Sequence, residues 1–214
     1  MEPIVVFGAG GHAKVVAQTL RRLRSFELLG FIDEVDPARK GEPFGGATIL
    51  GGREVLGTLL GRGVRAMAIA FGANDARLQR SIEMAALGFA FPTLVDPEAV
   101  VADDVPTGAG TYIAAGAVVQ PGASLGNQVI VNTGAIVEHD CRVGDGVHLC
   151  PRSCLAGHVK VGCCTWIGAG ALVRDRIEIG DKSFIGIGGL VLADVPSGIL
   201  AHGHPARHIG KASV

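Results

Sequence analysis

The chain has 214 residues, of which 33 are glycine and 5% are aromatic, and its net charge is −1 at pH 7. The length suits one large or two small domains, and the near-neutral charge argues against a broad surface for nucleic acid or another polyanion. No segment has the uninterrupted apolar length of a membrane span, the first residues lack a signal-peptide pattern, and 5 cysteines without framework spacing are typical of reduced thiols, so we expect a cytoplasmic protein.

Residues 1–95 alternate between strand and helix patterns. The patterns predict strands at 4–7, 28–32, 66–71 and 89–95, helices at 13–23 and 54–60, a glycine-rich loop at 41–52, and a third helix that Asn74 or Asp75 caps and that ends near Leu87. This alternation predicts an α/β domain with a small Rossmann-like parallel sheet. We place the domain boundary at Asp96-Pro97, so that the domains are 1–95 and 96–214.

The segment between the first strand and the first helix predicts a phosphate site. Residues 8–11 read Gly-Ala-Gly-Gly, and a helix N-terminus there would attract an anion. The third glycine of a dinucleotide fingerprint is replaced by Ala13, so a single nucleotide is the better fit. Asp33 ends the second strand, where an acid often meets a ribose hydroxyl. His12 could reach across a subunit boundary, but alone it is only a loop histidine.

From Ile113 to Val191 every sixth residue is aliphatic. A period of six fits neither a helix nor an ordinary strand and is the signature of a parallel β-helix. Three hexads make one triangular coil, so residues i and i+18 lie above one another. The tail from Val195 to Val214 leaves this phase.

One β-helix segment, Glu138-His139-Asp140, carries candidate catalytic chemistry. The flanking Val137 and Cys141 occupy inward slots, so His139 and Asp140 lie off the interior face. An imidazole is the usual general base, and a neighbouring carboxylate fixes its tautomer. Gly157, eighteen residues on, would lie above His139 and present an N–H to an oxyanion. Alternatively, His139 is a solvated surface residue and Gly157 an ordinary corner glycine.

Three further features remain open between binding and structural roles. His148 stacks under Trp166, either as a ligand or subunit contact or as packing. Asn132 orients a substrate or belongs to an asparagine ladder or turn. Lysine and arginine are absent from 101–141 and present in the later coils, where they could hold the phosphates of coenzyme A or remain ordinary solvated charges.

The cysteines and histidines suggest neither covalent nor metal chemistry. No cysteine has a base at a recognisable spacing, so an acyl-cysteine intermediate is not expected. His139, His148 and His158 lie nine and ten residues apart, so we expect no close histidine pair in the coils and no metal site. A zinc-dependent hydratase on the same β-helix nevertheless stays open as an alternative.

Five motifs together resemble a known family: GAGGHAKV after the first strand, FIDE after the second, FGAND after the third, NTGAIVEHD in the β-helix and GHPAR in the tail. They are similar to the NeuD/PglD-type sugar O/N-acyltransferases. This family includes N-acetyltransferases of nucleotide-linked 4-amino-4,6-dideoxy sugars, such as perosamine and bacillosamine-pathway enzymes, with sialic-acid O-acetyltransferases as relatives. The resemblance implies a left-handed parallel β-helix, a homotrimer, acetyl-CoA between adjacent β-helices, and a nucleotide-linked amino sugar at the N-terminal domain.

The resemblance also implies roles for individual residues. His139 would be the base, Asp140 (Glu in many members) would raise its basicity, and Gly157 would be the oxyanion donor. The implied substrate contacts are Gly10, Gly11, His12, Asp33, Glu34 and Asn132. The implied acetyl-CoA contacts are His148, Gly168, Ala169, Gly186 and Ile187. We expect direct N-acetyl transfer; a sialic-acid O-acetyltransferase and a non-catalytic nucleotide-sugar-binding trimer are the further alternatives.

Overall fold

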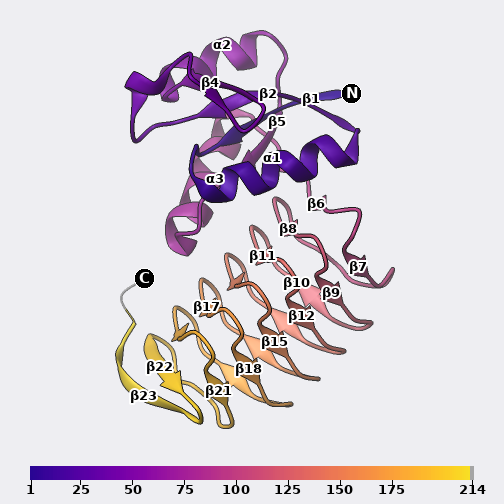
Figure 1. Ribbon diagram of the computed structural model, residues 1–214, viewed down its shortest axis with the longest axis vertical. Helices are drawn as coiled ribbons and strands as arrows, with labels where there is room; N and C mark the ends of the chain where they lie inside the picture. The colour runs from indigo at the N-terminus through magenta and orange to yellow at the C-terminus, as the bar shows by residue number, and fades with distance from the viewer. Residues whose placement is uncertain (213–214) are drawn as a thin grey trace.

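A computed structural model describes residues 1–212 and contains two units, an α/β sheet unit and a left-handed parallel β-helix beneath it (Figure 1). Residues 213 and 214, the end of the expected second domain, lie outside the described residues. Among the described residues, no helix has the length and hydropathy needed to cross a membrane.

The sheet of the N-terminal unit has the strand order β3-β4-β2-β1-β5. Its strands are β1 (Glu2–Phe7), β2 (Phe26–Ile32), β3 (Pro43–Phe44), β4 (Ala47–Gly51) and β5 (Ala66–Ile69). All pairings are parallel except β3 with β4. In β1, Ile4 and Val6 face one apolar cluster while Val5 and Phe7 face another. The continuous apolar run is therefore explained by burial on both faces of the sheet.

Helices cover both faces of this sheet. They are α1 (Gly11–Leu23), α2 (Leu56–Gly61) and α3 (Asn74–Leu87), with short 3-10 turns η1 (Pro37–Arg39) and η2 (Arg53–Val55). α1 packs Ala13, Val16 and Leu20 into the cluster that continues to the β-helix. α3 ends at Gly88, whose φ of 104° is the left-handed cap that glycine favours.

Three expectations for this unit are wrong. Residues 41–52 are not a plain loop, because Gly45 and Gly46, with φ of 53° and 84°, turn the chain into the β3–β4 hairpin. Neither Asn74 nor Asp75 caps α3; Ala73 precedes the helix and makes no side-chain cap. Residues 89–95 are not a strand of this sheet, since β5 bridges only Ala90 and the last two residues pair in the β-helix.

The β-helix predicted from the hexads is present, and it consists of two-residue strands joined by four-residue turns. In each strand the second residue points inward, and aliphatic residues such as Val137, Leu155 and Val173 fill the interior. Residues 18 apart pair in parallel, as Ile136 does with Cys154. This repeat gives the molecule three flat faces with different surfaces.

The face that we call the docked face carries the N-terminal unit. Its strands are β6 (Leu94–Val95), β8 (Tyr112–Ile113), β11 (Ile130–Val131), β14 (His148–Leu149), β17 (Trp166–Ile167), β20 (Phe184–Ile185) and β22 (Ile199–Gly203). Tyr112 and Ile130 point outward into the α1 cluster. Thr19 of α1 also contacts Asp96 at 2.7 Å and the Tyr112 hydroxyl at 2.9 Å.

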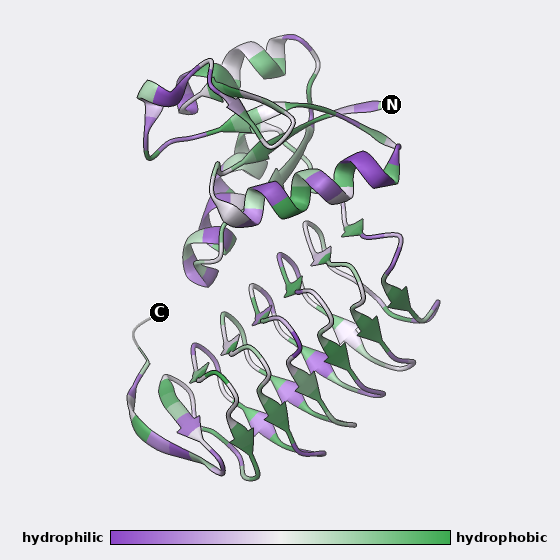
Figure 2. Cartoon of the chain, viewed as in Figure 1, coloured by the Kyte–Doolittle hydropathy of each residue, from purple (hydrophilic) through white to green (hydrophobic). Residues whose placement is uncertain are grey.

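The second face, which we call the apolar face, is built from strands whose residues are hydrophobic, as their green colour shows in Figure 2. Its strands are β7 (Val100–Val101), β9 (Val118–Val119), β12 (Ile136–Val137), β15 (Cys154–Leu155), β18 (Leu172–Val173) and β21 (Leu190–Val191). The outward Val100 and Leu172 are 64% and 46% exposed. An ordered stripe of this kind on a sheet is unusual for a surface that faces only water.

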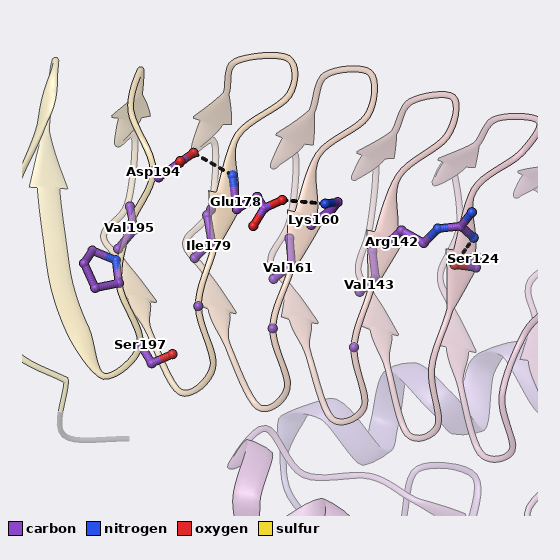
Figure 3. A pocket seen from close by; sticks show the side chains of 14 residues that line it. Ser124, Arg142, Val143, Lys160, Val161, Glu178, Ile179, Asp194, Val195 and Ser197 are labelled. Carbon is purple, nitrogen blue, oxygen red and sulfur yellow. Dashed lines mark hydrogen bonds and ion pairs between the residues drawn. The ribbon is translucent and has the colours of Figure 1, made fainter.

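The third face is polar. Its strands are β10 (Ser124–Leu125), β13 (Arg142–Val143), β16 (Lys160–Val161) and β19 (Glu178–Ile179). Figure 3 shows Lys160 paired with Glu178 and Arg142 bonded to Ser124 along a shallow groove of about 600 Å³. Because these charges and hydroxyls satisfy one another between neighbouring coils, this face suits solvent.

The tail closes the far end of the β-helix. β22 pairs in parallel with β20, and β23 (Ala206–Lys211) folds back antiparallel on β22. The hairpin covers an edge that the last coil would otherwise expose.

Candidate active site

His139 and Asp140 lie in the turn between β12 and β13, at the corner where the apolar face meets the polar face. His139 Nδ1 is 2.9 Å from Asp140 Oδ2, and the side chains are 55% and 51% exposed. The hydrogen bond from His139 holds the pKa of the Asp140 carboxyl below its usual value. A proton on Nδ1 is needed for this bond, so Nε2 is the nitrogen left to accept another proton.

Gly157 lies directly above His139, in agreement with the predicted stacking. A Cβ at Gly157 would be 2.7 Å from Cε1 and Nε2 of the His139 ring, so no larger residue fits without displacing the imidazole. Among the hydrogen bonds of residues 1–212, none uses the Gly157 amide as a donor. The unused N–H of Gly157 and the free Nε2 of His139 therefore belong to neighbouring groups, as an acyl-transfer site requires.

His158 is a close neighbour that the sequence analysis missed. It lies one coil above Asp140, its Nε2 is 3.7 Å from Asp140 Oδ2, and its ring centroid is 5.1 Å from that of His139. The expectation of no close histidine pair is therefore wrong. The stacking rule itself implies this contact, because His158 follows Asp140 by 18 residues.

A second site is a cavity of about 640 Å³ at the carboxyl ends of β1, β2 and β5. It brings together five of the expected substrate contacts: Gly10, Gly11, His12, Asp33 and Glu34. The N-terminus of the 13-residue α1 opens into it, so unpaired backbone N–H groups and the helix dipole favour an anion. This edge of a parallel sheet is where open α/β folds bind ligands.

Two arginines in this cavity were not anticipated. Arg39 is 2.7 Å from the buried Asp33, whose Oδ1 also accepts the N–H groups of Val35 and Asp36. Arg80 is 2.6 Å from Glu34. The acids are thus already paired with guanidinium groups that can also meet phosphates. Arg39 and Arg80 come from η1 and α3, and no local spacing links them to the glycine motif.

His12, at the start of α1, lines this cavity and also lies close to side chains of the docked face. Its ring is 5.5 Å from Tyr112 and 6.4 Å from His148. Asn132 Nδ2 is 3.1 Å from His148 Nε2, and the His148 and Trp166 rings are 4.4 Å apart. Burial, with the charge of Arg77 second, lowers the pKa of His12 to about 4 and of His148 to about 3. Both imidazoles are therefore neutral at pH 7.

The remaining expected cofactor contacts lie at the corner between the docked face and the apolar face. Gly168 and Ala169 follow β17, and Gly186 and Ile187 follow β20 one coil later. A Cβ at Gly168 would be 2.6 Å from backbone atoms of the next coil, so the two turns stack tightly. Ile187 is 82% exposed and forms the outer ridge of this corner.

The structure therefore divides the expected site residues into two groups. Asn132, His148 and the glycine corner lie on the side of the cavity at the N-terminus of α1. His139, Asp140 and Gly157 lie at the other edge of the apolar face, and among the contacts of residues 1–212 none joins the two groups. A single chain does not assemble them.

Two buried cysteine thiols, Cys141 and Cys150, remain protonated at neutral pH. Burial raises the pKa of Cys141 to about 11 and that of Cys150 to about 12. A protonated, buried thiol is a poor nucleophile, which agrees with the expectation that no acyl-cysteine forms.

Comparisons place these features among known proteins. Residues 3–83 match the family model described as the PglD N-terminal domain. The acetyltransferase domain of PglB from Neisseria gonorrhoeae is 35% identical with a TM-score of 0.92, over 98% of this chain and 100% of that chain. PerB from Caulobacter crescentus, solved with CoA and GDP-perosamine, is 35% identical with a TM-score of 0.90, over 98% of each chain. WeeI from Acinetobacter baumannii, 23% identical with a TM-score of 0.85 over 98% of this chain and 100% of that chain, shares the fold. A search of curated proteins found no match.

Proposed function

Because the chain belongs to the NeuD/PglD-type family of sugar acyltransferases, we propose that it is an acetyl-CoA-dependent sugar N-acetyltransferase. Its substrate would be the 4-amino group of a nucleotide-linked 4-amino-4,6-dideoxy sugar, of the GDP-perosamine or UDP-sugar type. The observation that carries the proposal is the hydrogen-bonded His139–Asp140 pair directly beneath the unused Gly157 amide. The expected use of acetyl-CoA is supported by the PglB domain solved with acetyl coenzyme A.

The proposed reaction is direct transfer in a ternary complex. His139 Nε2 takes a proton from the sugar amine as the amine nitrogen attacks the thioester carbonyl. The Gly157 N–H donates to the tetrahedral oxyanion, and Asp140 stabilises the imidazolium that forms. When the tetrahedral species collapses, the C–S bond breaks, the His139 imidazolium gives its proton to the sulfur, and CoA leaves as the thiol. A positioned general base contributes roughly 10²- to 10⁴-fold in rate.

We further propose that the chain acts as a homotrimer whose site is shared between neighbours. The His139 corner and the cavity side lie at opposite edges of the apolar face, and that face carries exposed Val100 and Leu172. In a cyclic trimer each contact joins two different edges of neighbouring subunits. Packing the apolar face in this way would bring the His139 corner of one subunit against the corner with Gly168 and His148 of the next.

The primary test measures CoA thiol release from acetyl-CoA with GDP-perosamine, UDP-linked 4-amino-4,6-dideoxy sugars, and free and CMP-linked sialic acid. Turnover of one 4-amino sugar, lowered about 10²- to 10⁴-fold in His139→Ala, is the expected result. Turnover of sialic acid alone would make the chain an O-acetyltransferase. No turnover of any sugar by the metal-free protein would reject the transferase and favour a nucleotide-sugar-binding trimer or, where added zinc produces hydration of a substrate, a hydratase.

A mixing experiment tests the shared site. His139→Ala lacks the base, and Gly11→Glu places a carboxylate at the mouth of the phosphate cavity, where a Cβ meets nothing within 4 Å. Each variant alone should be inactive. Unfolding and refolding the two together should restore activity, because mixed trimers contain sites with an intact base from one chain and an intact cavity from another. Mixtures that stay inactive would mean that each site lies within one chain.

A further inference from the structure

We propose that His139, Asp140 and His158 form a binding site for a first-row divalent cation such as Zn²⁺, and that the bound ion switches the catalytic base off. The inhibitory effect rests on the proposed function, whereas the binding site does not. The three side chains each offer one ligand atom, and these atoms all lie within 4.8 Å of one another. Two imidazoles and one carboxylate are a donor set that Zn²⁺ and its neighbours accept.

The distances within the cluster suit one ion. Zinc binds imidazole nitrogen and carboxylate oxygen at about 2.0–2.2 Å, so two ligands of the same ion lie at most about 4.3 Å apart. Asp140 Oδ2 is 2.9 Å from His139 Nδ1 and 3.7 Å from His158 Nε2. The His139 and His158 side chains are 55% and 41% exposed, so both rings have room to turn toward a shared ion. Asp140 would lie between the two histidines as the shared ligand.

The fold holds this cluster together through two neighbouring columns of the β-helix. Asp140 and His158 occupy the same corner position in successive coils, with φ of 61° and 62°. Below Asp140 is Gly122, where a Cβ would lie 2.6 Å from the carboxylate, so the space that the carboxylate fills depends on glycine. Glu138 lies in the same turn, with its carboxylate 3.4 Å from the His139 amide nitrogen, and adds negative charge that attracts a cation.

The described residues give His158 no other structural or catalytic role. Its ring contacts are with Asp140 and His139, and the proposed transfer does not use it. Without His158, only the adjacent His139 and Asp140 would remain, and two ligands hold a transition metal far more weakly than three. His158 is therefore the residue that distinguishes a metal site from an ordinary catalytic pair.

Metal binding at His139 Nδ1 would remove the base by fixing its tautomer. In the free enzyme the Nδ1 proton is donated to Asp140, and Nε2 is the acceptor. When a cation takes the Nδ1 lone pair, the neutral ring carries its one proton on Nε2 instead. Binding thus moves the proton from Nδ1 to Nε2, with no net loss from the neutral ring. With Nε2 protonated, His139 cannot take the proton of the sugar amine.

The test compares wild type, His158→Asn and a matched control, His208→Asn in the tail strand β23, all as the full-length tag-free protein. Asparagine tolerates the left-handed backbone at this corner, so the substitution removes a ligand with little strain. Binding of Co²⁺, followed by its visible absorbance, and of Zn²⁺, by competition with a chromogenic chelator, is measured without substrate. Wild type and the control should bind one ion per chain, and His158→Asn should bind more than about tenfold more weakly.

Turnover is then measured with added Zn²⁺. His158→Asn should keep its metal-free rate within about twofold and require at least tenfold more Zn²⁺ for half inhibition than wild type. Equal affinity in wild type and His158→Asn would overturn the metal site. Stoichiometric binding that leaves turnover unchanged would overturn the inhibitory role. A chain that binds the ion but has no transferase activity would retain the site and reject the proposed function.

Discussion

Replacing Arg77 by methionine should separate the two units of the chain. Arg77 of α3 is 1% exposed. Its guanidinium donates to the carbonyl oxygens of Gln128 at 2.9 Å and Gly146 at 2.7 Å in the β-helix, and of Phe71 at 3.2 Å and Gly72 at 3.1 Å. No other hydrogen bond among residues 1–212 reaches these four oxygens. The Arg77 side chain therefore donates hydrogen bonds to carbonyl groups of both units at the domain junction.

The magnitude follows from these four carbonyl groups. Leaving a buried acceptor unpaired costs about 1–3 kcal/mol, so the low end of that range gives about 4 kcal/mol for the set. Removing the guanidinium also relieves a buried charge, since burial lowers the pKa of Arg77 to about 10. This relief offsets part of the loss, whereas methionine recovers packing but none of the hydrogen bonds. We expect Arg77→Met to lower the free energy of unfolding by about 3 kcal/mol.

The assay uses the single tryptophan of the chain, Trp166. It lies on the docked face against His148, so its fluorescence reports undocking of the N-terminal unit, while far-UV circular dichroism reports loss of secondary structure in the two units. Urea titrations at one protein concentration should show the Trp166 transition moving to lower urea before the dichroism changes. Arg62→Met, at an exposed arginine of the same unit, is the matched control and should change stability by less than about 0.5 kcal/mol. A loss below about 1 kcal/mol in Arg77→Met, with unchanged Trp166 emission, would refute this account of the junction.

Three other outcomes follow from the same coordinates. Gly157→Ala forces a methyl group against the His139 ring and should lower kcat at least about tenfold with little change in Tm, measured by steady-state kinetics and calorimetry. Leu172→Glu places a charge on the apolar face and should convert the expected trimer to monomer in sedimentation velocity; a trimer that persists would contradict the assigned interface. His12 and His148 have folded-state pKa values lowered below the unfolded value of about 6.5, so their contribution to stability is complete above about pH 6.5. It is lost as the pH falls toward about 4 for His12 and about 3 for His148, with a slope of up to about 2.7 kcal/mol per pH unit while both protons are involved. Urea titrations at several pH values should show this fall, and His148→Gln should halve the slope.

Much of the β-helix was predictable because the six-residue repeat determines, from its sequence position alone, the coil and the face on which each residue lies. The inward residues, the parallel register of 18 and the stacking of Gly157 on His139 all follow from the hexads, and the structure has each of them. The same count places His158 above Asp140, because the two residues are 18 apart in the sequence. No coordinates were needed for that step.

The N-terminal unit was less predictable because its important contacts are not local. Arg39 and Arg80 reach the cavity from different elements, and Arg77 bonds to Gln128 and Gly146 across a domain boundary. Strand β6 could not be placed from local sequence for the same reason. The apolar run that follows α3 is compatible with the N-terminal sheet and with the first coil of the β-helix. Only the outward Tyr112 and the α1 cluster decide that Leu94 belongs against the β-helix.

The division of the site into two groups is itself readable from the repeat. Gly168 and Gly186 follow Asn132 by whole multiples of 18 residues, so all three share one corner. His139 follows Asn132 by only seven residues, which is one hexad and one further step, and it therefore lies at the next corner. Residues at different corners of a packed triangular prism cannot meet around one substrate, because the filled interior and the apolar face lie between them. If both groups serve one reaction, the second corner has to come from another copy of the chain, and the exposed Leu172 row between the two corners is where that copy would pack.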